Sequence, residues 1–125
     1  MIMKITLLKS PKSDKKFRVI LPSGKKVDFG QMGYSDFTIH KNPMRMRSYV
    51  QRHGGSVPKR TMDETNPSEV KRRMLRVTKS DKENWRRNGI DTAGFWSRWL
   101  LWSHPTISGA AKIIEEKFGV DIKRK

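Results

Sequence analysis

Ile90-Asp-Thr-Ala-Gly-Phe-Trp-Ser-Arg-Trp-Leu-Leu-Trp102 decides the fold of this chain, because three of the four tryptophans lie in it. A side-chain oxygen of Asp91 or Thr92 can cap a helix at its start. Pro105 cannot continue a helix, so this one should stop near residues 102–103. Almost its whole circumference is apolar, which is too wide for a surface helix. We therefore expect it to form the core of a small domain, with docking of part of its aromatic face on a partner, or base stacking, as alternatives.

The helical spacing divides this stretch into faces. Phe95, Trp99 and Trp102 fall on one stripe, and Trp96 and Leu100 fall on a second stripe beside it. Because Trp and Arg are favoured anchors at protein interfaces, Trp102 is a predicted partner contact, as is Arg98 from the remaining face. The residues left for that face are Ser97, Arg98 and Leu101.

The composition is strongly basic and lacks cysteine. Lys and Arg number 28 against 12 Asp and Glu, a net charge of +16, which favours polyanionic partners or an acidic neighbouring surface. Without cysteine the chain has no disulfide and no thiolate metal site, which suits a reducing compartment. The short apolar start resembles no signal peptide, and no stretch approaches the length of a membrane span. We expect a soluble intracellular protein, or a component of a particle assembled inside a cell.

The N-terminal third alternates in the manner of β-strands. Residues 2–8 predict a first strand, and 17–21 and 26–30 predict a hairpin around the Pro22-Ser-Gly-Lys25 turn. Two or three strands cannot stand alone, so they should pack on the helices. The predicted fold is a small α+β domain, an N-terminal β-hairpin or three-stranded antiparallel sheet packed on an aromatic-rich helical region. Its predicted hydrophobic centre consists of Phe17, Val19, Val27, Phe29, Phe95, Trp96, Trp99 and Phe118.

Capping patterns predict the remaining helices. Asn42-Pro43 and Asn66-Pro67 each open a helix, the first ending near His53 and the second carrying Val70, Met74 and Val77 inward. Residues 56–65 between them predict a linker. The chain should form one domain, 1–125, with a β-rich region over residues 1–40, a basic helical region over 41–87 and a C-terminal region over 88–125. Other predictions are a short helix over 81–87 opened by Ser80, a last helix capped by Ser108 and closed at Gly119, and a frayed tail over 121–125.

Positive charge concentrates in the middle of the chain. Residues 41–87 hold 14 Lys and Arg against 5 Asp and Glu, net +9 of the +16. The predicted contacts with partner proteins are Arg45, Arg47, Arg52, Arg72, Arg73 and Arg76, in addition to Arg98 and Trp102. Non-specific DNA binding is the alternative, because an Arg-rich helix provides an electrostatic footprint for phosphates. Its predicted residues are Lys71, Arg72, Arg73 and Arg76.

The chain shows no pattern of catalytic or metal-ligating residues. His40, His53 and His104 are far apart and lack the spacing of a metal site. No glycine-rich segment is followed by the Lys-Ser/Thr of a phosphate loop. We therefore expect neither an enzyme nor a cofactor.

Three motifs resemble a family of small basic proteins encoded by nucleocytoplasmic large DNA viruses of the iridovirus and chlorella-virus type. They are Phe17-x-Val-x-Leu-Pro-x-Gly-Lys-Lys-Val-x-Phe-Gly30, Tyr34-Ser-Asp-Phe-Thr-Ile-His-Lys41 with Arg47-x-Tyr-x-x-Arg-His53, and Trp85 with Gly89 to Trp102 and Pro105-Thr-Ile107. The resemblance covers about two thirds of the chain. In that family the second motif is followed soon by the third, so residues 54–82 are interpreted as an insertion.

The resemblance implies a structural virion protein. It would be a minor capsid, or cement, protein, present in the virion capsid and assembled in the host cytoplasm. Its implied partners are the major capsid protein and other minor capsid proteins, bound through a basic surface and apolar anchors. Viral DNA is the alternative partner, with a non-specific DNA-binding or genome-packaging role. Contact with an inner viral membrane surface stays open, without a membrane span.

Overall fold

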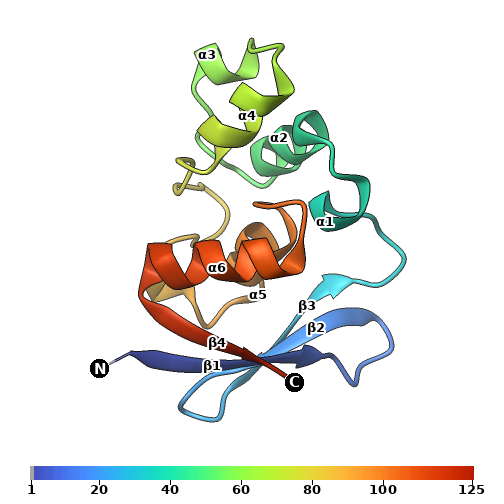
Figure 1. The fold of residues 1–125 in the computed structure, drawn as a ribbon, viewed down its shortest axis with the longest axis vertical. Coiled ribbons are helices and arrows are strands. Elements are labelled where there is room, and N and C mark those ends of the chain that lie inside the picture. The colour runs from blue at the N-terminus through green and yellow to red at the C-terminus, as the bar shows by residue number, and fades with distance from the viewer. Residues whose placement is uncertain (1) are drawn as a thin grey trace.

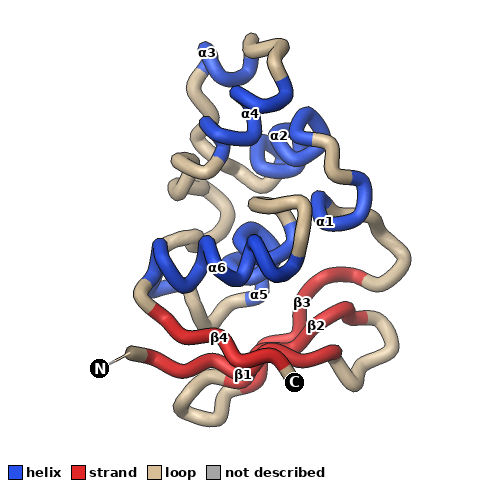
Figure 2. The backbone as a smooth tube through the Cα atoms, in the orientation of Figure 1, coloured by secondary structure: helices blue, strands red, loops and turns tan. Residues whose placement is uncertain are grey.

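One four-stranded mixed sheet forms the base of the molecule in the computed structural model of this protein, which describes residues 2–125 (Figures 1 and 2). The strand order is β3-β2-β1-β4, with β1, β2 and β3 antiparallel and β4 parallel to β1. All helices lie on one side of this sheet (Figure 1). The strands are β1 (Met3–Lys9), β2 (Lys15–Ile20), β3 (Lys26–Gln31) and β4 (Val120–Arg124).

The predicted hairpin is confirmed, and the structure supplies its register. Phe17 pairs with Phe29 and Val19 pairs with Val27, so the four apolar side chains share the face that meets the helices. Val19 and Phe29 are fully buried, and Phe17 is partly buried against the same core. The predicted α+β class is therefore confirmed, with a fourth strand added to the sheet.

The C-terminal segment is a strand, and the prediction of a frayed tail is wrong. Val120 and Ile122 alternate with charged residues and pair with Met3 and Ile5 of β1, which turns their side chains toward the core. The Lys125 backbone N–H still donates to Leu7 O at 2.8 Å. Charged side chains are typical of an edge strand, because they oppose pairing with another chain. The high charge of this segment therefore marks a sheet edge.

Helical elements fill the space above the sheet. The aromatic α5 and the long α6 lie next to the sheet, whereas α3 and α4 lie farthest from it (Figure 1). Their bounds are α1 (Phe37–His40), α2 (Pro43–Arg52), α3 (Lys59–Met62), α4 (Pro67–Met74), the 3₁₀ turn η1 (Arg87–Gly89), α5 (Ala93–Trp96), the π-helical turn η2 (Ser97–Leu101) and α6 (Ile107–Phe118).

The aromatic helix is buried, as predicted, but it is not a regular helix. Thr92 caps it, since its Oγ1 accepts from Phe95 N at 3.4 Å. From Ser97 the helix widens into the η2 π-turn and ends at Trp102. All residues from 98 to 101 are buried, so the wide turn gives every side of this stretch an internal environment. The predicted hydrophobic centre is confirmed.

Two capping predictions need correction. Thr106, not Ser108, caps α6, because its Oγ1 accepts from Gly109 N at 3.0 Å. Residues 81–86 form no helix, and Arg87 only begins the 3₁₀ turn η1. Ser80 Oγ does accept from the next backbone N–H groups, but the Glu83 carboxylate turns to Trp85 Nε1 at 2.8 Å instead of completing the cap. Burial of Trp85 then fixes this segment as an irregular crossing of the core.

Residues 54–82, the predicted insertion, leave the body and return at neighbouring points. A bridge pairs Gly55 with Ser80, and Ser56 N donates to Lys79 O at 2.9 Å. We call this segment, which contains α3 and α4, the projection (Figure 1). The projection is not an independent unit, because its residues Val70 and Met74 are fully buried in the common core. Within the described residues, no helix is long and apolar enough to cross a membrane.

Candidate binding surfaces

A hollow lies between α2, the segment from β3 to α1, and the start of α5. Its volume is about 460 Å³, and we call it the α2 groove. A second hollow of about 330 Å³ shares Arg45, Arg52 and Trp102 with it, so the two are continuous. The side chains that give the groove its chemistry are Lys15, Tyr34, Arg45, Tyr49, Arg52 and Trp102.

Stacked rings form the wall of the α2 groove. Tyr49 and Trp102 are parallel, with ring centroids 4.2 Å apart, and His53 stacks on Tyr49 at 4.0 Å. Burial raises the pKa of Tyr49, so its hydroxyl is protonated at neutral pH. Glu83 accepts from Trp85 Nε1 and lies 3.4 Å from His53 Nδ1, which places one carboxylate at the inner end of the groove. The wall therefore combines stacked rings with one carboxylate.

An internal ion pair holds the segment between β3 and α1, which also lines the groove. Lys16 Nζ donates to Asp36 Oδ2 and to the Tyr34 carbonyl, each at 2.6 Å, and both charged side chains are largely buried. Asp36 also caps α1 by accepting from Thr38 N at 2.8 Å. Because Asp36 is fully engaged in this way, it supports the fold. Tyr34 itself is left 67% exposed.

The arginines of α2 differ in availability. Arg47 is turned inward to the projection, where its Nη1 donates to Thr61 O at 2.7 Å and to Glu64 O at 2.8 Å. Arg45 and Arg52 are exposed, and neither forms an ion pair with any residue from 2 to 125. Of the three predicted partner contacts on this helix, two are thus free to bind and one joins α2 to α3.

Arg98 is entirely inside the protein, so the prediction that it contacts a partner at the surface is wrong. Its guanidinium donates to Trp102 O and Met74 O, each at 2.6 Å, and to Val77 O at 3.3 Å. Its Cζ lies 4.4 Å from the Trp99 ring centroid. Burial lowers the pKa of Arg98 to about 9, which leaves it charged at neutral pH. A cation at the end of α4 satisfies carbonyls that the helix leaves unpaired.

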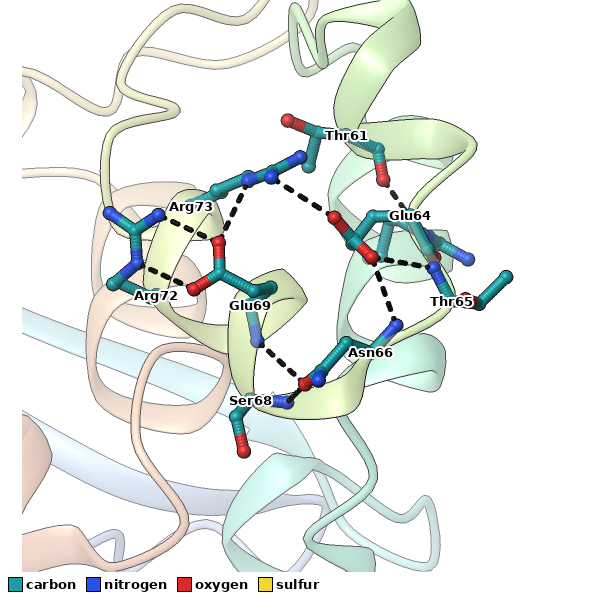
Figure 3. Close-up of polar contacts among 9 residues, drawn as sticks. Thr61, Glu64, Thr65, Asn66, Ser68, Glu69, Arg72 and Arg73 are labelled. Atoms are coloured by element: carbon teal, nitrogen blue, oxygen red, sulfur yellow. Dashed lines mark hydrogen bonds and ion pairs between the residues drawn. The ribbon is translucent and has the colours of Figure 1, made fainter.

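Arginines from α3, from α4 and from the residues after α4 surround a separate hollow of about 240 Å³. We call it the arginine hollow, after Arg60, Arg72, Arg73 and Arg76. Figure 3 shows that two of these are already paired within the projection. Arg72 Nη2 lies 2.7 Å from Glu69 Oε2, and Arg73 lies between Glu69 and Glu64, at 3.3 and 3.0 Å.

Glu64, not Glu69, completes the cap at Asn66. Glu69 lies three residues after Asn66, which is the position of the glutamate in a capping box, but it binds the two arginines instead. Glu64 Oε2 accepts from Asn66 N at 3.1 Å, while Asn66 Oδ1 accepts from Ser68 N (Figure 3). Glu64 therefore closes the turn before α4, and both glutamates neutralise some of the positive charge of α4.

The other predicted DNA contacts are less crowded. Arg76 is exposed and has no ion pair among residues 2–125. Lys71 is half-buried, and it contributes, after burial, to lowering the pKa of His104. Within residues 2–125, no group of three or more His, Asp or Glu side chains could hold a metal ion.

Sequence reasoning missed several residues of the α2 groove. Lys15, Tyr34 and Tyr49 come from three elements, and only the fold brings them together. Tyr34 and Tyr49 both belong to the motifs quoted above, and Tyr34 lies in a segment without periodicity, which is typical of a surface loop with a binding role. That signal identifies the segment but not the residues opposite it.

The comparisons with known proteins concern the N-terminal half. Residues 5–53 match the model of a family described as a family of unknown function (DUF5754). The match ends at His53, directly before the projection begins. No curated protein and no solved structure matches the chain.

Proposed function

We propose that this chain is a minor capsid protein of a large DNA virus, which binds between or beneath major capsid proteins and cements them. The family resemblance of the three motifs supports this proposal. The function needs a compact protein whose surface chemistry complements acidic neighbours and whose geometry does not change on binding. It needs no cofactor and no catalytic step.

The observation that carries the proposal is the presence of two separate basic surfaces on one rigid scaffold. The α2 groove presents Arg45 and Arg52, and the arginine hollow presents Arg60 and Arg76. The two surfaces share no lining residue. A protein that bridges neighbours needs at least two such surfaces, whereas a single-site binder needs one.

Internal bonds keep the two surfaces in a fixed relation. Arg98 joins the end of α4 to the aromatic helix, and Arg47 joins α2 to α3. Lys117 Nζ donates to Leu75 O at 3.1 Å and adds a bond from α6 to the same projection. Since isolated surface ion pairs contribute little, a cement protein relies on many contacts held in register, and a rigid scaffold provides that register.

Partition of the protein during stepwise disassembly of virions tests the proposal. Purified particles of the virus that encodes the chain are treated with increasing salt and detergent, and then with nuclease to remove DNA. We expect the protein to stay with empty shells at moderate salt, because apolar anchors supplement its ionic contacts. Release together with the DNA, with a steep salt dependence, would overturn the proposal in favour of genome packaging.

A further inference from the structure

Arg45 and Arg52 are spaced to receive two separate acidic groups. They are seven residues apart on α2, so they lie on one face about 10.5 Å apart along the axis. Each lines both hollows of the α2 groove, and neither is paired within residues 2–125. In a peptide of polyproline II conformation three residues cover about 9.3 Å, and the repeat of three residues per turn puts positions i and i+3 on the same face. The spacing therefore suits carboxylates three positions apart in a polyproline II segment.

Trp102 adds a hydrogen-bond donor beside these charges. The indole N–H groups of the other tryptophans are bonded internally, Trp85 to Glu83, Trp96 to Ile90 O and Trp99 to Trp85 O. Trp102 lines both hollows, and within residues 2–125 its indole N–H has no protein partner, nor is it a buried unpartnered atom. It is thus free to donate to a ligand carbonyl or carboxylate.

The segment that contributes Tyr34 to the groove exposes several apolar side chains. Within the described residues four large apolar side chains are exposed, and three of them lie in the segment 32–39, namely Met32, Tyr34 and Ile39. Tyr34 lines the groove itself. An exposed aromatic side chain such as Tyr34 beside free arginines is typical of a protein-binding surface, where aromatic and Arg side chains supply most of the affinity.

The groove chemistry favours a peptide over a nucleic acid or a membrane. Single strands bind to exposed aromatic faces, but Tyr49 and Trp102 are buried and stacked on each other. Glu83 at the inner end repels a continuous phosphate chain, whereas a peptide can place a neutral residue there. The surface is also concave, which suits an inserted segment better than a flat bilayer.

We propose that the α2 groove is the docking site for an acidic segment of a partner protein. Two carboxylates bind Arg45 and Arg52, one acceptor binds the Trp102 indole N–H, and one apolar side chain packs on Tyr34. Arginine is suited to this role because its planar fork can bind each carboxylate through two hydrogen bonds. The inference names the partner chemistry of the proposed cement function and rests on that function only for placing the partner in a capsid.

Titration of the full-length ¹⁵N-labelled protein with a synthetic peptide tests the inference. The peptide carries two aspartates three positions apart next to a leucine, and the control peptide has asparagines in their place. We expect sub-millimolar binding of the acidic peptide that shifts the Trp102 indole signal and leaves those of Trp96 and Trp99 in place. The asparagine peptide should bind at least tenfold more weakly.

Paired charge reversals locate the binding. R45E/R52E should weaken binding of the acidic peptide at least tenfold, whereas R60E/R76E, the same charge change at the arginine hollow, should alter it less than twofold. R45Q/R52Q repeats the test should the reversal disturb folding. The inference is overturned by an unmoved Trp102 signal, by equal loss in both reversals, or by stronger groove binding of a single-stranded oligonucleotide or an anionic phosphatidylserine vesicle.

These outcomes are separable from the test of the proposed function. If the protein leaves virions with the DNA but its groove binds the acidic peptide, the capsid role is excluded and the docking site is supported. If the protein stays with empty shells but its groove binds no acidic peptide, the capsid role is supported and the docking site is excluded.

Discussion

The arginines of α2 and those of α4 come from the same basic stretch of sequence, yet the fold uses them differently. On α2, Arg45 and Arg52 face a groove without a partner among the described residues. On α4, Arg72 and Arg73 are held by Glu64 and Glu69 within the projection. The density of positive charge is similar in the two regions, but its availability for a ligand is not.

The difference follows from local sequence. The helix α2 contains no acidic residue, so its outward arginines have no neighbour to pair with. The helix α4 carries Glu69 in its first turn, three and four residues before the two arginines, which is the spacing at which helical side chains meet. Net charge alone therefore predicts basic regions, whereas i,i+3 and i,i+4 pairing decides which arginines stay free.

Replacing Arg98 with methionine should produce the largest effect, because it breaks the link between the two regions. The carbonyls of Met74, Val77 and Trp102 would lose charge-assisted hydrogen bonds inside the core. We expect the free energy of unfolding to fall by about 3 kcal/mol, measured by urea denaturation. Amide exchange in α4 should accelerate more than exchange in the sheet.

The conservative variant R98K serves as the comparison. Lysine keeps the charge, but its single ammonium cannot span carbonyls on two sides as the fork of arginine does. We therefore expect R98K to lose most of the same stability. R98M could instead be as stable as the wild type. In that case the hydrogen bonds of Arg98 would only offset the cost of desolvating its charge, and apolar packing would hold α4 on the aromatic helix.

Alanine at Gly55 should loosen the projection where it joins the body. A Cβ at this position would lie 2.5 Å from Val50 Cγ1 and 3.0 Å from Trp85. Because of this overpacking we expect the free energy of unfolding of G55A to fall by about 2 kcal/mol, again measured by urea denaturation. At Gly94 a Cβ would meet only the carboxylate end of Glu83, so G94A should cost less. Equal effects would mean that the base of the projection is not rigid.

Asp28 tests a paired charge in the sheet, at a residue that lines neither arginine surface. The hydrogen bond from Arg18 is the main cause that lowers the Asp28 pKa to about 2, helped by one from Ser10. Since the folded pKa lies below the unfolded one, the stabilisation is present above about pH 4 and is lost as the pH falls to about 2. D28N should lower the free energy of unfolding by about 1 kcal/mol at pH 7.

The pH dependence provides the check on Asp28. The difference in stability between D28N and the wild type should shrink toward zero near pH 2, in urea denaturation series at several pH values. A difference that stays constant with pH would show that the carboxamide disturbs packing and that the ion pair with Arg18 contributes little.

Sequence patterns predicted the elements whose signals are local. The hairpin, the caps at Asn42 and Asn66, and the burial of the aromatic stretch follow from alternation, capping chemistry and helical spacing, and all three are confirmed. The strand β4 was missed because pairing with β1 is a contact between the two ends of the chain. Its inward residues, Val120 and Ile122, are too few to outweigh the surrounding charge.

The sequence predicted individual residues of the candidate site but not their grouping, because the grouping depends on contacts between distant segments of the chain. Arg45, Arg52 and Trp102 were identified by residue type, but the fold was needed to show that they share one groove. Arg98 was misread because the π-turn rotates it into the core, and arginine is seldom buried without a charged partner. No sequence signal distinguishes it from Arg45.

Freeing the arginines of α4 should have the smallest effect on stability and the most direct bearing on the comparison with α2. E64Q/E69Q removes both carboxylates, while the amide oxygens can still accept the backbone bonds at Thr65 and Asn66. Exposed ion pairs contribute little to stability, so the free energy of unfolding should change by less than about 1 kcal/mol. Binding to a short DNA duplex should tighten, with a log–log salt slope steeper by about 2, because two more cations reach phosphates.

The control for this prediction is E116Q/D121N, which makes the same change in net charge at exposed carboxylates without ion pairs in the described region of the chain. It should leave the salt slope nearly unchanged, since no arginine is released. A wild-type protein with the same slope as E64Q/E69Q would mean that Arg72 and Arg73 already exchange Glu64 and Glu69 for phosphates. The two helices would then be equivalent as anion-binding surfaces, and the distinction between free and paired arginines would hold only in the absence of a ligand.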